Sequence, residues 1–362
     1  MKLGYLFMFI SALLICSCKK EVIVEIEKKY SWEPSPMFLY EKKIQTTSFA
    51  NDEVMYSLGI NTFSTIRANP DNPDELAAVH SHLYFNYPIE RKMPLSAEIL
   101  VGMETTSLGF YSTRFPFPDG GVNFSMKSID PLFASFYTPY YSLGTCFGLN
   151  ELNQCLVPYH IYDTTYAASN TIKYEPSFYF FNLISGFPNL LVERVDTLSC
   201  VKINKEDNWG GVIAINAVGK NFFVTCSNKT VRINDEAVPE MSFDGILYRI
   251  FEYNNVLYGL SINNLFRSSD NGLNWISVQT IDPDLVNLNF QTIDGKLTGF
   301  FKSQLFYFDL TPEGFIAVQE MLNDGIEDDE ITSITQFRDR VFVTTFSGVF
   351  EKNLEDFFTF KE

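Results

Sequence analysis

The feature that most constrains the fold of this chain is a unit that recurs four times in its C-terminal half. Each unit is an apolar run, a tight polar turn and a second apolar run, as in Val256-Leu-Tyr-Gly-Leu-Ser-Ile-Asn-Asn-Leu-Phe-Arg267. The other copies occupy residues 221–233, 297–307 and 341–351. Runs rich in β-branched and aromatic residues on either side of a polar turn predict β-hairpins.

The spacing of these units indicates a propeller. When Val231, Leu265, Leu305 and Val349 are taken as equivalent positions, they are separated by 34, 40 and 44 residues. A period of this size and variable length is typical of propeller blades, whose loops differ while their strands do not. At roughly 40 to 45 residues per blade, the span from Ser48 to Glu362 holds about seven, with six or eight as alternatives. We therefore predict an all-β fold, a β-propeller of four-stranded blades.

A further strand precedes each unit and is joined to it by a tight turn. The turns are Gly219-Lys220, Asn254-Asn255, Asp294-Gly295 and Arg338-Asp339. Glycine, asparagine and aspartate favour the positive φ angles of short hairpin turns. Three strands of each blade are therefore visible in the sequence, and the fourth is inferred.

Residues 70–200 follow the pattern less regularly and are rich in tyrosine, phenylalanine and proline. This stretch predicts either further blades or an insertion. Helical periodicity is weak throughout the chain. Only Asp71–Val79 and Glu355–Phe360 are expected to form a helical turn or two.

The clearest motif is Ser268-Ser-Asp-Asn-Gly-Leu-Asn-Trp275. It resembles the Asp-box, or BNR repeat, of sialidase-like propellers, Ser-x-Asp-x-Gly-x-Thr-Trp, with Asn274 in the threonine position. We expect Asp270 to accept hydrogen bonds from amides of the turn and Gly272 to supply a positive φ. In that family the box is a folding device away from the ligand face. The resemblance implies structural roles for Ser268, Asp270, Gly272 and Trp275.

The resemblance covers residues 205 to 362 and makes a sialidase-like, glycan-cleaving enzyme the catalytic alternative. Such an enzyme needs converging arginines, an acid, and a tyrosine nucleophile with a carboxylate partner. Thr65-Ile-Arg-Ala-Asn-Pro70 comes nearest to the arginine motif but lacks its aromatic residue and adjacent proline. A fold does not supply an activity by itself. We therefore assign no catalytic residue and expect binding or scaffolding, with assembly of an envelope complex as a further alternative.

The N-terminus has the pattern of an exported lipoprotein. One lysine and an apolar run from Leu3 to Ile15 precede Ile15-Cys-Ser-Cys18, and this run is too short to span a bilayer. The stretch resembles a bacterial lipobox, which implies a signal peptide over residues 1–17 and a lipid on Cys18. An ordinary signal peptide is the alternative. We expect a tether over residues 18–40, a propeller over 41–362, and anchoring in the cell envelope, in the outer rather than the inner membrane.

The amino-acid composition restricts the classes of partner that we expect. The chain of 362 residues has 44 acidic and 27 basic residues, a net charge of −17. This charge disfavours nucleic acid and anionic lipid surfaces as ligands. An apolar fraction of 46% indicates a substantial core. The expected partners are the membrane, through the anchor, and a protein or glycan ligand, with no cofactor.

Four cysteines remain besides the anchor and the signal peptide. Export would place them in an oxidising compartment, where pairing is favoured. Short loops close readily, which favours disulfides between Cys146 and Cys155 and between Cys200 and Cys226. Free buried thiols are the alternative.

Two further clusters contain residue types that can bind a metal ion. On a strand, His80 and His82 would face one side, but no third zinc ligand follows at a telling distance. Residues 323–330 are dense in carboxylates without the donor spacing of an EF-hand. We interpret the first as surface histidines and the second as a solvated loop, and we predict no metal site.

Overall fold

The computed structural model describes residues 31–38, 44–82, 95–114, 121–137, 147–162, 172, 176–186, 195–203 and 205–361. These residues belong to one compact unit that begins at Ser31. The folded unit thus includes residues 31–38, which lie within the stretch predicted as a tether. The predicted signal peptide, Cys18 and Cys146 lie outside the described residues. Among the helices that are described, none has the length and apolar character needed to cross a bilayer.

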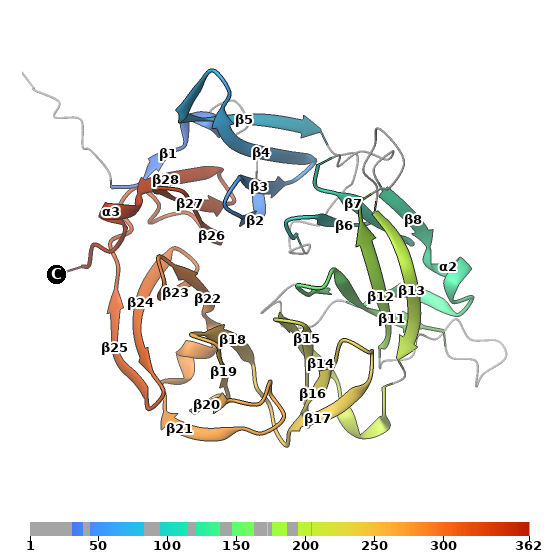
Figure 1. The fold of residues 1–362 in the computed structure, drawn as a ribbon. Coiled ribbons are helices and arrows are strands. Elements are labelled where there is room, and N and C mark those ends of the chain that lie inside the picture. Colours follow the sequence, from blue (N-terminus) through green and yellow to red (C-terminus); the bar gives the residue numbers. More distant parts are fainter. Residues whose placement is uncertain are drawn as a thin grey trace, which may run out of the picture. The chain divides into compact units, whose positions relative to one another are not determined.

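The strands form seven antiparallel sheets arranged as the blades of a propeller (Figure 1). The predicted all-β propeller with about seven blades is confirmed. Blade 1 contains β2 (Gln45–Ala50), β3 (Val54–Gly59), β4 (Thr62–Asn69) and β5 (Asn72–His82). Blade 2 contains β6 (Ile99–Met103), β7 (Ser107–Ser112) and β8 (Gly121–Ser125). Blade 3 contains β9 (Phe133–Phe136), β10 (Gly148–Leu149), β11 (Gln154–Ile161), β12 (Ser177–Ser185) and β13 (Val195–Ile203).

The remaining blades are the regular ones. Blade 4 contains β14 (Val212–Val218), β15 (Asn221–Cys226), β16 (Thr230–Ile233) and β17 (Pro239–Phe243). Blade 5 contains β18 (Arg249–Tyr253), β19 (Val256–Leu260), β20 (Asn264–Ser268) and β21 (Ile276–Thr280). Blade 6 contains β22 (Asn289–Ile293), β23 (Lys296–Phe301), β24 (Gln304–Thr311) and β25 (Gly314–Glu320). Blade 7 contains β26 (Ile331–Phe337), β27 (Arg340–Thr345), β28 (Val349–Asn353) and β1 (Glu33–Pro34).

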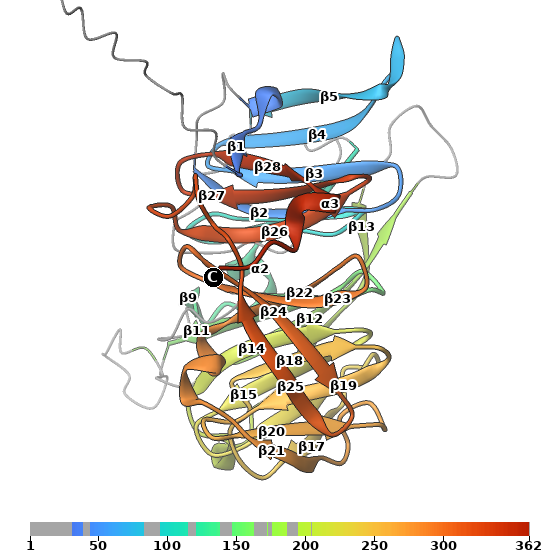
Figure 2. The same ribbon diagram turned by 90° about the vertical axis from the view of Figure 1, so that its left-hand side faces the viewer.

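The first strand of each regular blade lies innermost in the ring. Strand β2 contacts β26, β26 contacts β22, β22 contacts β18, and β18 contacts β14. The strands of each blade run between two ends. We call the end that carries the turn between the first two strands the turn face. The opposite end, which carries the segment leading to the next blade, is the linker face (Figure 2).

The ring is closed by the first described residues. Strand β1 pairs antiparallel with β28, so the N-terminal segment supplies the outermost strand of the last blade. Trp32 is buried beside it, and its ring packs edge-on against that of Phe357, with ring centroids 6.0 Å apart. Asp324 accepts hydrogen bonds from the backbone N and the Oγ of Ser31. Closure thus joins residues about three hundred positions apart in the chain.

The sequence repeats correspond to blades 4 to 7. The four positions taken as equivalent all lie on the third strand of a blade, on β16, β20, β24 and β28, and all are buried. The four predicted turns join first and second strands, and each contains a residue with positive φ. In blade 2, helix α2 (Met126–Ile129) follows β8 where the regular blades have a fourth strand.

Two helical predictions have different outcomes. A short helix α3 (Leu354–Phe357) forms near the C-terminus, as expected. The helical turn predicted over Asp71–Val79 is wrong, because these residues belong to the β4–β5 hairpin, with Ala78 opposite Ile66. Pairing with β4, together with partial burial of Leu76 and Ala78 against the core between blades 7 and 1, outweighs their helix propensity.

Candidate functional site

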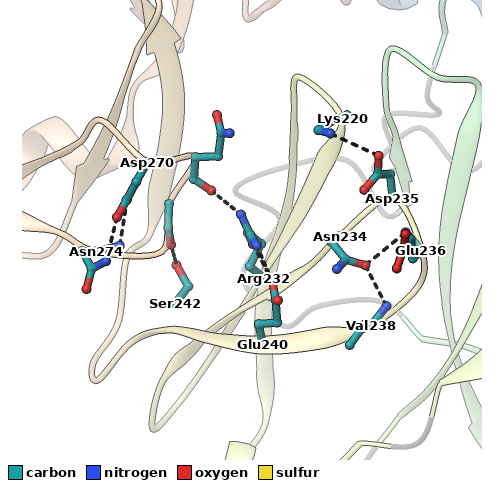
Figure 3. Close-up of polar contacts among 12 residues, drawn as sticks. Lys220, Arg232, Asn234, Asp235, Glu236, Val238, Glu240, Ser242, Asp270 and Asn274 are labelled. Atoms are coloured by element: carbon teal, nitrogen blue, oxygen red, sulfur yellow. Dashed lines mark hydrogen bonds and ion pairs between the residues drawn. The ribbon is translucent and has the colours of Figure 1, made fainter.

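The motif that resembles an Asp-box, Ser268 to Trp275, forms the turn between β20 and β21, on the turn face of blade 5, and is called the Asp-box turn below. Ser268 Oγ donates to Asp270 Oδ1 at 2.7 Å and accepts from the N of Gly272 at 2.9 Å. Asp270 in turn accepts from both the backbone N and the side-chain amide of Asn274, at 2.9 and 2.6 Å (Figure 3). These bonds hold the pKa of Asp270 at about 2, chiefly because the Asn274 amide stabilises the carboxylate.

The same turn packs against blade 4. Trp275 Nε1 donates to Ser242 Oγ on β17 at 2.9 Å, and Ser242 Oγ donates to the carbonyl of Gly272 at 2.5 Å. Arg232 on β16 donates to the carbonyl of Asn271 at 3.0 Å and also pairs with Glu240 (Figure 3). A Cβ on Gly272, whose φ is +81°, would lie 2.4 Å from the ring of Phe223. Hydrogen bonds between the turn and side chains of blade 4 therefore link blades 4 and 5. These side chains have their partners within the fold.

The histidine and acidic clusters also have partners within the fold. His80 Nε2 lies 2.9 Å from the carbonyl of Met37, and its Nδ1 lies 2.8 Å from Ser64 Oγ, so this ring pins the N-terminal segment to blade 1. It is half-buried and not a surface histidine as predicted, whereas His82 is exposed. In the acidic loop, Asp324 binds Ser31. No group of three or more metal-ligating side chains occurs among the residues that the structure describes.

The predicted disulfide between Cys200 and Cys226 is wrong, and the one predicted between Cys146 and Cys155 involves a cysteine outside the described residues. Cys155 and Cys200 both carry free thiols. They lie opposite Phe181 on its two sides, Cys155 buried on β11 and Cys200 exposed on β13. Cys226 is buried in blade 4, where its thiol donates to the carbonyl of Val224 at 3.9 Å. Proximity in sequence misled the prediction for Cys200 and Cys226, because β13 and β15 belong to different blades.

The innermost strands carry different side chains on two sides of the ring. Between blades 7 and 1, Ser48 Oγ lies 2.6 Å from Ser333 Oγ and 2.5 Å from Thr335 Oγ1. Near the turn face of blades 4 to 6, a cavity of about 290 Å³ is lined by residues of the three inner strands and by Leu297 of β23, with Glu252 as its one charged lining residue. Rings of Phe251 and Phe290 stack there with centroids 4.3 Å apart.

Arg67, from the stretch nearest to the sialidase arginine motif, is exposed on β4, the third strand of blade 1. It therefore lies off the innermost strands of the ring. A sialidase-like site needs several arginines converging on the substrate carboxylate. The arginine best placed by sequence does not take that role.

A larger cavity, of about 560 Å³, lies between blades 5 and 6. We call it the blade 5–6 groove. Its walls are β21, the linker with the 3-10 helix η4 (Pro283–Asn287), and parts of β23, β24 and β25. Ile281, Leu288 and Phe315 are buried in it, whereas Ile316 and Val318 are 69% and 44% exposed at its rim. Its polar lining residues are Gln279, Thr280, Asp282, Asp284, Asn287 and Gln304.

Two buried polar contacts fix the shape of the groove. The guanidinium of Arg249 donates from Nε to the carbonyl of Val286 at 3.1 Å and from Nη2 to that of Asn287 at 3.3 Å. Burial lowers the pKa of this arginine to about 10. On the other wall, the side-chain amide of Gln279 accepts from the N of Phe315 at 2.8 Å and donates to its carbonyl at 3.3 Å. These hydrogen bonds fix the positions of the linker and of β25, which are two walls of the groove.

Sequence reasoning missed this groove. Its lining comes from two blades, and Phe315-Ile-Ala-Val318 reads as an ordinary strand. The available signal is a strand with apolar residues on both faces, since a solvated outer strand normally alternates.

The chain matches no protein-family model and no curated protein. Among solved structures it is similar to a catalytically inactive virginiamycin B lyase from Staphylococcus aureus with quinupristin, at 10% identity and a TM-score of 0.51, covering 89% of this chain and 98% of that one. The extracellular domain of the putative one component system BT4673 from B. thetaiotaomicron gives 10% identity and a TM-score of 0.49, covering 90% of this chain and 40% of that one. At such identities, the likeness to the lyase shows the fold alone.

Proposed function

We propose that this chain is an exported, lipid-anchored propeller that binds a ligand in the blade 5–6 groove. The observation that carries the proposal is the groove itself. Ligand sites are concave and mostly apolar, with a few polar groups, and this cavity of about 560 Å³ has both properties. The rim residues Ile316 and Val318 add apolar surface that the described part of the chain leaves exposed.

The position of the groove supports the same proposal. It includes η4 in the linker from blade 5 to blade 6, which belongs to the linker face, and it extends to β25. The Asp-box turn lies on the turn face, and in the family it resembles the box lies away from the ligand. The lipobox pattern at Cys18 supports membrane attachment. A binding protein of the cell envelope is the function that accommodates these features without an assigned catalytic group.

Site-specific photo-crosslinking in the living cell tests this proposal. Benzoylphenylalanine in place of Ile316 should give a discrete ultraviolet-dependent adduct. The matched control is Val79, which is 63% exposed on β5 of blade 1 and should give none. Equal labelling at both positions, or at neither, would overturn the assignment of the groove. In parallel, fatty-acid labelling should mark the wild-type chain and be lost in Cys18→Ala.

A further inference from the structure

We infer that the ligand of the blade 5–6 groove is an extended protein segment that carries aliphatic side chains and a lysine or arginine, and that lies along β25. This inference rests on the proposed function and specifies the class of ligand. Four observations carry it: the direction of the β25 backbone, the chain segment already paired with β25, the apolar lining, and the charge at one end of the groove.

The first observation concerns the free edge of β25. The N of Met321, directly after the strand, donates to the carbonyl of Leu305 on β24 at 2.8 Å. The carbonyl of Glu320 points the other way and accepts from the N of Lys361 at 3.1 Å. Backbone groups alternate along a strand, so Val318 also directs its N–H and C=O away from β24. In the part of the chain that the structure describes, no backbone partner meets them.

The second observation is that this edge already pairs with an extended segment. At its far end, Leu322 N donates to the carbonyl of Thr359 at 2.8 Å, and Met321 pairs with Phe360 in an antiparallel bridge. Lys361 Nζ adds an ion pair with Glu320 at 2.7 Å. The edge therefore accepts an extended chain with an apolar and a basic residue, and Val318 continues the same edge into the groove.

The third observation favours a peptide over a glycan. A glycan needs several free hydrogen-bonding groups to match its hydroxyls. Of the six polar lining residues, Gln279 is already bonded to Phe315 through both polar atoms of its amide, and Asp282 accepts from the N of Asp284. The groove offers instead Leu285, Leu288 and Phe306 beside the exposed Ile316. Alternate side chains of an extended peptide fill an apolar surface of this kind while its backbone pairs with the strand edge.

The fourth observation is the charge. Asp282 and Asp284 are exposed lining residues at the η4 end of the groove, and the chain carries a net charge of −17. An acidic segment would be repelled there, and a basic side chain attracted. Charge complementarity therefore adds a lysine or arginine to the aliphatic requirement.

The test uses the full lipidated chain in detergent and three fluorescein-labelled octapeptides. The probe is Lys-Val-Thr-Val-Lys-Val-Thr-Val. The second peptide has glutamate in place of both lysines, and the third is the probe N-methylated at alternate residues. We expect saturable fluorescence polarisation with the probe. Dissociation constants should rise about fivefold or more on N-methylation, which removes backbone donors, and about tenfold or more with glutamate.

Protein variants locate the binding. Ile316→Lys should weaken binding of the probe about tenfold or more, since it places a charge on the apolar rim and repels the lysines. The matched control, Met241→Lys on β17, replaces a residue that is 64% exposed and should leave binding unchanged. Equal binding of the glutamate or N-methylated peptide, or equal effects of the two variants, would overturn the inference. An adduct at Ile316 without probe binding would also reject this ligand class while leaving the proposed function intact.

Discussion

Asn274 donates two hydrogen bonds to the Asp270 carboxylate, one from its backbone and one from its side chain, at 2.9 and 2.6 Å. Threonine occupies this position in the motif that the turn resembles, and here the asparagine amide supplies a side-chain donor. The two residues close the turn on itself. Asp270 is therefore engaged by its own hairpin.

The first prediction is that Asp270 stabilises the fold and not the ligand. Asp270→Ala removes the acceptor for the Asn274 donors, which should lower the free energy of unfolding by about 1 to 3 kcal/mol. Urea denaturation measures the change, with the exposed loop residue Asp328 replaced by alanine as a control that should have little effect. Probe binding in the folded fraction should be unchanged. A stable Asp270→Ala protein that no longer binds would place the motif in a functional site.

The second prediction concerns pH. The pKa of Asp270 is about 2 in the folded chain, below its ordinary value of 3.8, so its stabilising contribution is complete above pH 3.8. The contribution is lost as the pH falls from 3.8 toward 2. The difference in unfolding free energy between wild type and Asp270→Asn should therefore shrink over this range and stay constant between pH 5 and 7. A difference that grows on acidification would contradict the assignment.

The third prediction concerns ring closure. Trp32 is 1% exposed, and its indole donates to the carbonyl of Leu322 at 3.3 Å. Trp32→Ala should cost about 3 to 5 kcal/mol of unfolding free energy, because a large buried side chain leaves a cavity. Phe346→Ala, at a position that is 37% exposed, serves as the control for loss of an aromatic ring. Equal effects in thermal or urea unfolding would show that Trp32 is not part of the closure.

The fourth prediction concerns the thiols. Native alkylation followed by mass spectrometry should modify Cys200, which is exposed on β13, and should leave the buried Cys155 unmodified until the chain unfolds. Although the side chain is exposed, neighbouring atoms partly desolvate the Cys200 thiol and raise its pKa to about 11, so its labelling should accelerate as the pH rises from 7 to 9. Detection of a disulfide at either residue in unreduced protein would contradict the structure.

The regular half of the fold was predictable because its signals are local. Val231 and Leu265 occupy the same buried place in successive blades, and the turns before them contain Gly219 and Asn254 with positive φ. Period and turn chemistry suffice for blades of this kind. The Asp-box turn was predictable for the same reason, since its hydrogen bonds join residues within four positions of each other.

The features that could not be predicted from the sequence depend on contacts between residues far apart in the chain. Strand β1 is only Glu33–Pro34, and its partner Glu351 lies at the other end of the chain. A proline is tolerated there because an outermost strand leaves one row of backbone groups unpaired. The groove depends on Gln279 meeting Phe315 across two blades, and no periodicity reports such a contact. The role of residues 31–38 in ring closure was not predicted, and neither was the groove. Both depend on contacts between distant parts of the chain.

The pairing of β1 with β28 has a mechanical consequence. Force applied to the chain ahead of Ser31 enters the ring at the bonds between Ser31 and Asp324, and then at a strand of two residues. The pull would strip β1 from the outside of blade 7 one contact at a time, while the other strands of that blade stayed paired. The seam that completes the propeller is therefore also the place where it would yield first under tension.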